Sequence, residues 1–286
     1  MSRRTPIDDP ACAIAQAADV LGDWWSLLVL RDVARGRCRF DELRTSLGVS
    51  RAVLTDRLQA LVADGVLARR RYSTRPPRDE YVLTPRGRGA LPILVALQDF
   101  GDRWLLGDGA VTATTGSDSV EATRVRGLIG TTVPVLAGLD PVSDTPCTVV
   151  YCYPGTHMPG SREVPGAAGC TLESCTYRDR LAEFAALGAS VRGVSTQPPF
   201  EQAAFAAESR ISFPLLSDAG LELTTALRLP TFRAGGTVRL KRLTLLVSRD
   251  RLVRDVLYPI ADVTGSVEDA LAMVRIFAGT AAAGSG

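Results

Sequence analysis

The sequence is poor in the residues from which metal sites are usually built. It has a single histidine, His157, and its six cysteines form no C-x-x-C pair. Structural zinc sites are assembled from cysteine and histidine ligands at close, regular spacing. We therefore expect no metal site, and no motif indicates a bound cofactor.

Long hydrophobic runs are also absent. The longest apolar stretches, such as residues 27–30, fall far short of the roughly 20 residues that a membrane span needs. Near the start, Arg3 and Arg4 are followed by Asp8 and Asp9 rather than by an apolar core. We therefore expect no membrane segment, no signal peptide and a cytoplasmic location.

Lysine is almost missing, because Lys241 is the only one. The net charge of +2 conceals an uneven distribution: between Arg31 and Arg88 there are 14 arginines and 7 acidic residues. The basic surface is therefore built from guanidinium groups, which suit phosphate oxygens and guanine edges.

The length of 286 residues suggests two domains. A hydrophobic content of 46% with 22% charged residues is typical of globular proteins rather than disordered ones. Small, polar residues without periodicity make 107–119 the clearest linker. We predict one domain over 1–106, a linker over 107–124 and a second domain over 125–286.

The first half has a mainly helical pattern that ends in a hairpin. Helices are expected over 12–21, 23–35 and 40–47, then from the capping residue Ser50 to Gly65, and finally over 85–106; strands are expected over 66–72 and 80–83. Two short helices joined by a tight turn and followed by a basic hairpin are typical of a winged helix-turn-helix domain.

This geometry predicts which side chains meet double-stranded DNA. The helix that follows the tight turn would enter the major groove with Ser50, Arg51, Thr55 and Arg57. The hairpin would grip phosphates or reach a minor groove with Arg69, Arg70, Arg71, Arg75 and Arg78. A solvated basic face is the alternative, and Arg51 could contact either a base or a phosphate.

The sequence resembles the HxlR family of bacterial winged-helix regulators at Cys12 and over residues 18–32, 39–43 and 50–58. It departs from the family at Trp24 and Ala13. The resemblance covers about 10–106 and implies a homodimer in which the first and last helices of two chains pack together. It also makes Cys12 a candidate redox switch, although a buried structural cysteine is an equal alternative. Arginines on both sides of Cys38 would also favour a thiolate there, but an incidental, half-exposed cysteine is the favoured interpretation.

In the second half, strands and helices alternate, which predicts an α/β domain with an antiparallel pair of strands near its end. Strands are expected within 145–154 and at 189–196, 215–216, 243–247 and 252–258, and helices at 170–187, 200–210, 221–227 and 267–278. Cys147 and Cys152 flank the first strand and are expected to be buried.

Cys170 lies at a junction between a strand and a helix, where backbone N–H groups favour the thiolate. A peroxide converts a thiolate to a sulfenic acid, which condenses with a second thiol. Cys175 is five residues on, and in an intact helix such residues lie about 140° apart around the axis. A disulfide between them therefore requires the first helical turn to unwind.

The second half resembles the Q-type peroxiredoxins at residues 151–154, 169–179 and 193–197, which match the family in this order. The resemblance extends over about 125–280. It implies a thioredoxin fold with Cys170 as the peroxidatic and Cys175 as the resolving cysteine. It also implies an arginine that polarises the peroxide, for which Arg242 is the best match and Arg239 the second.

The sequence departs from the family pattern just before Cys170. Ala167 stands where the family has threonine or serine, Glu163 stands where it has proline, and residues 155–165 contain an insertion of about ten residues. Thr156 and Thr171 are the candidates for the missing hydroxyl. These departures weaken the case for fast peroxidase turnover.

We therefore expect a redox-sensing transcription regulator in which oxidation of Cys170 by peroxide or another oxidant, resolved by Cys175, modulates operator binding. One alternative is a thiol peroxidase with an appended autoregulatory DNA-binding domain, reduced by a thioredoxin-like partner. The other is a peroxiredoxin fold that serves dimerisation or binds another ligand.

Overall fold

The computed structural model describes residues 9, 11–75, 77–105, 113–136, 138–156, 164–234 and 236–283. It divides into two compact units, Met1–Leu94 and Val95–Gly286. His157, on the expected insertion, and residues 107–112 of the expected linker lie outside the described residues.

The first unit has the predicted winged-helix elements, and short polar residues begin several of its helices. The side chains of Asp23, Ser50 and Thr84 each accept a hydrogen bond from a backbone N–H of the helix that follows. The elements are α1 (Ala13–Leu21), α2 (Trp24–Ala34), α3 (Phe40–Leu47), α4 (Arg51–Ala63), β1 (Leu67–Thr74), β2 (Pro77–Leu83), α5 (Pro85–Arg88) and the start of α6 (Leu91–Trp104).

A tight turn joins α3 to α4, and an apolar core fixes the pair. Gly48 ends α3 with a φ of 63°, a left-handed conformation that glycine adopts at little cost. Leu43 of α3 and Leu54 and Leu58 of α4 are fully buried in the core of the unit. Arg57 of α4 lies 3.4 Å from Asp23, so this arginine also ties α4 to the start of α2.

The helix predicted over 85–106 is broken in two, because Gly89 and Ala90 separate α5 from α6. The second half of α6, from Val95 on, belongs to the second compact unit rather than to the first. The expected boundary at residue 106 therefore differs from the division by contacts. A further helix, α7 (Val120–Arg126), overlaps the end of the expected linker over 107–124.

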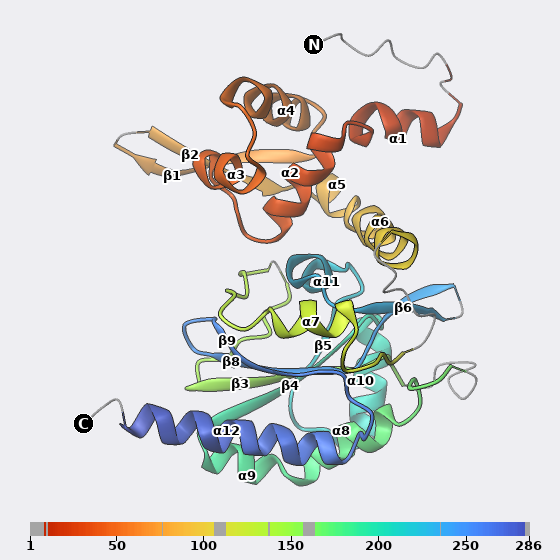
Figure 1. The fold of residues 1–286 in the computed structure, drawn as a ribbon, viewed down its shortest axis with the longest axis vertical. Coiled ribbons are helices and arrows are strands. Elements are labelled where there is room, and N and C mark those ends of the chain that lie inside the picture. Colours follow the sequence, from red (N-terminus) through yellow and green to blue (C-terminus); the bar gives the residue numbers. More distant parts are fainter. Residues whose placement is uncertain are drawn as a thin grey trace. The chain divides into compact units, whose positions relative to one another are not determined.

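A mixed five-stranded sheet forms the centre of the second unit, which confirms the predicted thioredoxin-like α/β fold (Figure 1). Its strand order is β5-β4-β3-β8-β9, with β3, β4 and β5 parallel and β8 and β9 antiparallel. The strands are β3 (Cys147–Cys152), β4 (Ala189–Ser195), β5 (Leu215–Ser217), β8 (Leu243–Ser248) and β9 (Val253–Leu257).

Helices cover both faces of this sheet and bury an apolar core on each side (Figure 1). On one face lie α7 and α11 (Glu222–Leu227). The other face is covered by α8 (Cys170–Asp179), α9 (Leu181–Ala186), α10 (Pro199–Glu208) and α12 (Gly265–Ala283). A separate hairpin of β6 (Thr231–Ala234) and β7 (Thr237–Leu240), which the sequence analysis missed, follows α11.

No single helix in the described part of the chain is long and apolar enough to cross a membrane; α1 and α2 reach that length and composition only as a pair bent by 74°. Nor do three or more histidine, cysteine or acidic side chains gather as a metal site within these described ranges.

Candidate functional site

Cys170 is the first residue of α8 and lies near the end of the central strand β3. Gly169 precedes it with a φ of 100°, a left-handed conformation that L side chains rarely adopt. This residue turns the chain into the helix, so that Cys170 faces inward and is buried. The site thus combines a helix N-terminus with the interior of the fold.

Arg242, just before β8, reaches the sulfur of Cys170. Its Nη2 donates to Cys170 Sγ at 3.1 Å, to the carbonyl oxygen of Ala168 at 2.7 Å and to that of Ala167 at 3.2 Å. The guanidinium therefore holds both the thiol and the loop that leads into it. Arg239, the second candidate, is near Gly155 instead, where an added Cβ would lie 3.0 Å from Arg239 Nη1.

Burial raises the pKa of the Cys170 thiol to about 11, although Arg242 acts in the opposite direction, and Glu173 adds to the rise. This is opposite to the direction expected from the helix N-terminus. Desolvation disfavours the thiolate more than the arginine and the backbone N–H groups favour it. In the reduced protein the thiol is therefore mostly protonated near neutral pH.

Glu173 completes the site, and the sequence analysis did not single it out. Its Oε2 lies 3.3 Å from Arg242 Nη1, and its Oε1 has no hydrogen-bond partner among the described residues. Burial raises the pKa of this carboxyl to about 7, with Arg242 opposing the shift. Its spacing of three residues from Cys170 was the available signal, since it places both on one face of a helix.

Cys175 lies on the same continuous helix as Cys170 but is only half-buried, and both cysteines are reduced. The rest of α8 is anchored: Tyr151 of β3 donates to Ser174 Oγ at 2.9 Å, and Tyr177 stacks on Tyr151. Arg178 lies 3.6 Å from the sulfur of Cys175. A Cys170–Cys175 disulfide therefore requires the first turn of α8 to leave the core.

Neither candidate hydroxyl hydrogen-bonds to Cys170 within the described residues. Thr171 is exposed, whereas Thr156 is buried and its backbone N–H donates to Gln197 Oε1 at 2.8 Å. The position three residues before Cys170 is Ala167, whose carbonyl oxygen accepts a hydrogen bond from the thiol at 3.6 Å. Among the described residues, the sulfur thus has a guanidinium partner but no side-chain hydroxyl partner.

The other cysteines have separate environments. Cys12 caps α1, and its sulfur accepts from the N–H of Ala15 at 3.5 Å. Burial raises the pKa of Cys38 to about 11 and Glu80 adds to the rise, which favours the incidental, half-buried cysteine over a thiolate. Cys147 and Cys152 are buried in the two opposite cores of the sheet.

In the first unit, the N-terminal end of α4 carries the predicted reading residues. Ser50 caps the helix, and its Oγ accepts from Val53 N at 3.3 Å. Arg51 is 72% exposed and Thr55 donates to the carbonyl oxygen of Arg51. Arg57 is half-buried against Asp23, which favours a structural role for it over contact with a base.

The hairpin β1–β2 carries the five arginines of the predicted wing, and all of them are exposed. Two of them already have acidic partners across the hairpin, because Arg70 pairs with Glu80 and Arg71 with Asp79. No acidic partner is found within the described part of the chain for Arg69, Arg75 or Arg78. The free positive charge of the wing is therefore concentrated on these three residues.

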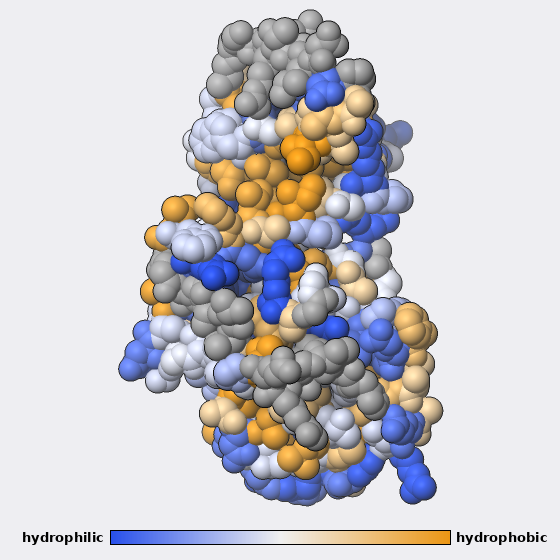
Figure 2. Space-filling view, turned by 90° about the vertical axis from the view of Figure 1, so that its right-hand side faces the viewer, coloured by the Kyte–Doolittle hydropathy of each residue, from blue (hydrophilic) through white to orange (hydrophobic). Residues whose placement is uncertain are grey.

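An apolar stripe runs along α6. Ile93, Leu97, Phe100 and Trp104 are all exposed, and their spacing of four, three and four residues puts them on one face of the helix. Ile14 of α1 is also exposed. Figure 2 shows hydrophobic residues gathered on one face of the first unit.

Comparison with known proteins matches each part to a different family. Residues 20–108 match the HxlR-like helix-turn-helix model, and residues 146–256 match the AhpC/TSA family model. The chain is 42% identical over 95 residues to an uncharacterized HTH-type transcriptional regulator of Synechocystis, covering 33% of this chain and 70% of the relative. Several mycobacterial regulators of the same description are covered over 59% of their length.

The second part has its own relatives. It is 35% identical over 134 residues to a Mycobacterium tuberculosis protein named "Putative peroxiredoxin". The match covers 47% of this chain and 80% of that protein. The crystal structure of peroxidoxin BcpB from Mycobacterium tuberculosis is 31% identical, covers 52% of this chain and 96% of that structure, and has a TM-score of 0.43.

Proposed function

We propose that this chain, which belongs to the HxlR-like helix-turn-helix family over its first part and to the AhpC/TSA family over its second, is a transcription regulator whose affinity for DNA depends on the oxidation of Cys170. A DNA-binding regulator domain and a peroxiredoxin-like domain are both present. The observation that carries the proposal is the buried contact of 3.1 Å between Arg242 Nη2 and Cys170 Sγ. It places a guanidinium, which favours the thiolate, against a buried sulfur in the same chain that contains α4.

The chemistry needs a hydroperoxide as the oxidant. The thiolate of Cys170 attacks the terminal peroxide oxygen, an S–O bond forms as the O–O bond breaks, and the sulfur loses two electrons. The leaving alkoxide or hydroxide takes up a proton, and Arg242 is placed to stabilise its negative charge. The product is a sulfenic acid on Cys170.

Cys175 then resolves the sulfenic acid. Its sulfur attacks that of Cys170, an S–S bond forms, and the oxygen leaves as water together with the proton of the Cys175 thiol. A thioredoxin-like dithiol returns two electrons and two protons to restore both thiols. Because α8 is continuous from Cys170 to Asp179, the disulfide form has a different local structure from the reduced form.

A thiol peroxidase is the second candidate, and the arrangement of Cys170, Arg242 and Glu173 favours it. Burial argues against fast turnover. Because burial raises the pKa of Cys170, only a small fraction of the thiol is a thiolate near neutral pH. A sensor that reacts once per signal tolerates this better than an enzyme does.

The DNA-binding part of the proposal rests on α4 and the wing. Arg51 is exposed at the start of α4, and the wing arginines extend from the hairpin, as a helix in the major groove and a phosphate clamp require. We further propose a homodimer that uses the apolar stripe of α6 together with α1, because an exposed helical stripe of this spacing suits packing against a second helix.

The test is a titration of genomic promoter fragments with reduced and peroxide-treated protein, followed by fluorescence anisotropy. We expect different affinities for the two forms, and no difference for Cys170→Ser. Cys38→Ser is the matched control, since Cys38 has a similarly raised pKa but lies in the first unit. Equal affinities of the two wild-type forms, with rapid peroxide turnover in a coupled assay, would favour the peroxidase instead.

A further inference from the structure

The second half of α6 is attached to its own compact unit by polar contacts. Thr231 of β6 donates to Asp99 Oδ1 at 2.7 Å, and Arg228 donates to Asp102 Oδ1 at 2.7 Å. Arg124 of α7 lies 3.7 Å from Asp102. Two carboxylates one helical turn apart therefore fasten α6 to β6, to α7 and to the end of α11.

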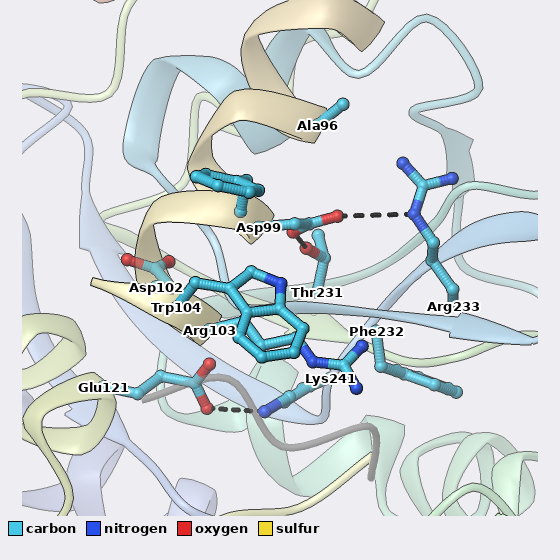
Figure 3. A pocket seen from close by; sticks show the side chains of 11 residues that line it. Ala96, Asp99, Asp102, Arg103, Trp104, Glu121, Thr231, Phe232, Arg233 and Lys241 are labelled. Atoms are coloured by element: carbon cyan, nitrogen blue, oxygen red, sulfur yellow. Dashed lines mark hydrogen bonds and ion pairs between the residues drawn. The ribbon is translucent and has the colours of Figure 1, made fainter. Parts of the chain in front are cut away.

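A cavity of about 260 Å³ lies beside these contacts (Figure 3). Phe100 and Trp104 of α6, Phe232 of β6 and the ion pair of Glu121 with Lys241 are among its lining residues. In Figure 3, dashed lines join Asp99 to Thr231 and Arg233, and Glu121 to Lys241. Space next to charged contacts allows them to rearrange without opening a close-packed core.

The β6–β7 hairpin also contacts the loop that leads into Cys170. Phe232 and Ala234 of β6 form a small apolar cluster with Ala113 and Ala167. The carbonyl oxygen of Ala167 accepts a hydrogen bond from Arg242 at 3.2 Å. The hairpin is therefore in contact with α6 on one side and with the Cys170 loop on the other.

Lys241 provides a second connection, because it is the chain neighbour of Arg242. Its Nζ lies 2.8 Å from Glu121 Oε1, to which the hydroxyl of Tyr258 also donates, and all three residues are buried. Arg124 lies 4.0 Å from the other oxygen of Glu121 and 3.7 Å from Asp102. An unbroken series of charges thus runs from Lys241 to α6.

We propose that the β6–β7 hairpin and Lys241 transmit the oxidation of Cys170 to α6 and loosen its attachment. When the first turn of α8 unwinds, Arg242 is separated from the sulfur of Cys170 and from the carboxylate of Glu173, which both lie in that turn. A buried guanidinium without these partners does not keep its place. The backbone at residues 241–242 then moves, Lys241 withdraws from Glu121, and Phe232 separates from Ala167.

α6 can pass this structural change on to the first unit. It begins at Leu91 in the first compact unit and ends at Trp104 in the second, so one continuous helix belongs to both. It also carries the apolar stripe assigned above to the homodimer. This transmission rests on the proposed function, but the change in the attachment of α6 is measured separately from DNA binding.

The experiment is hydrogen–deuterium exchange of the full chain, reduced and peroxide-treated, with the Cys170–Cys175 disulfide verified by mass spectrometry. We expect the amides of residues 98–104 to exchange about tenfold faster or more in the oxidised form, as the loss of one or two hydrogen bonds to charged groups implies. In Lys241→Met the disulfide still forms but the difference at α6 shrinks severalfold. Arg254→Met, an exposed arginine on β9, is the control and keeps the wild-type difference.

Thr231→Val is a second variant that keeps the shape of the residue and removes only its hydrogen bond to Asp99. This variant is expected to speed hydrogen–deuterium exchange at α6 already in the reduced protein. It is the variant used to test the transmission if Lys241→Met fails to fold. Unchanged exchange at α6 in wild-type protein that carries the disulfide overturns the transmission.

DNA affinity measured on the same samples separates this result from the proposed function. Affinity that changes while α6 stays protected overturns only the transmission. A change at α6 without a change in affinity overturns only the proposed function, and a Cys170 that resists oxidation altogether overturns both.

Discussion

Lys241 and Arg242 are neighbours in the chain, yet they form ion pairs on opposite faces of the central sheet. Lys241 lies 2.8 Å from Glu121 of α7, and Arg242 lies 3.3 Å from Glu173 of α8. Both cations are buried, so removing either acidic partner leaves an uncompensated charge in the core. The segment therefore has one preferred position while α8 is intact.

Arg242→Met is expected to slow the oxidation of Cys170 by roughly tenfold to a hundredfold, because it removes a charge-assisted hydrogen bond worth about 1.5–3 kcal/mol. The rate is measured by mass spectrometry of the Cys170 peptide after timed exposure to hydrogen peroxide. Arg254→Met serves as the matched arginine substitution on the surface. An unchanged rate would show that Arg242 only packs against the sulfur.

The oxidation rate is expected to rise with pH. Because the pKa of Cys170 is about 11, the thiolate fraction grows about tenfold per pH unit between pH 8 and 10. Below this range the slope is shallower, since Glu173 becomes protonated near pH 7 and no longer opposes the thiolate. Alkylation of Cys170 by iodoacetamide over pH 6 to 10 measures this, and a plateau above pH 7 contradicts it.

Substitutions in the wing are expected to fall into two groups. Arg78→Ala removes a charge that has no acidic partner in the described chain. The slope of the logarithm of the DNA association constant against the logarithm of the salt concentration then becomes shallower by about 0.9 for each phosphate that the wing no longer neutralises. Arg71→Ala has a smaller effect, because Asp79 already neutralises that arginine. Anisotropy with a mixed-sequence duplex over a salt series distinguishes them. Identical slopes for the two variants would refute the grouping.

The apolar stripe on α6 is expected to hold a dimer. A double substitution of Ile93 and Leu97 to glutamate places two charges in this surface and shifts the protein toward the monomer, as measured by light scattering after size exclusion. Val135→Glu, which alters an exposed apolar residue that lies on neither helix, is the control and leaves the mass unchanged. A dimeric double variant would place the interface elsewhere.

Much of the fold could be predicted because local patterns agree with the tertiary structure. The apolar spacing of α2 to α4, the caps at Asp23 and Ser50 and the glycine at 48 all act within a few residues. The elements that were missed are short. α7 has seven residues and each strand of the β6–β7 hairpin has four, so neither contains a full repeat of a recognisable pattern.

The chemistry of the site could be predicted only in part. The motif around residue 170 and the match at residue 242 identified two side chains that lie in contact. Their burial arises from chain segments far apart in the sequence, and so does the high pKa that it causes. For the same reason nothing around Lys241 indicated that this lysine would be buried against Glu121, 120 positions earlier.

In the proposed mechanism, the continuity of α8 also gives the response to oxidant a time scale. A sulfenic acid at residue 170 has to wait until the first turn opens before Cys175 can trap it. During that interval a second peroxide molecule competes and converts the sulfur to the sulfinic acid, from which the thiol is not recovered by simple reduction. In the proposed sensor, sparse oxidant would thus leave a reversible change and abundant oxidant a lasting one, and the stability of one helical turn would set the dose that separates them.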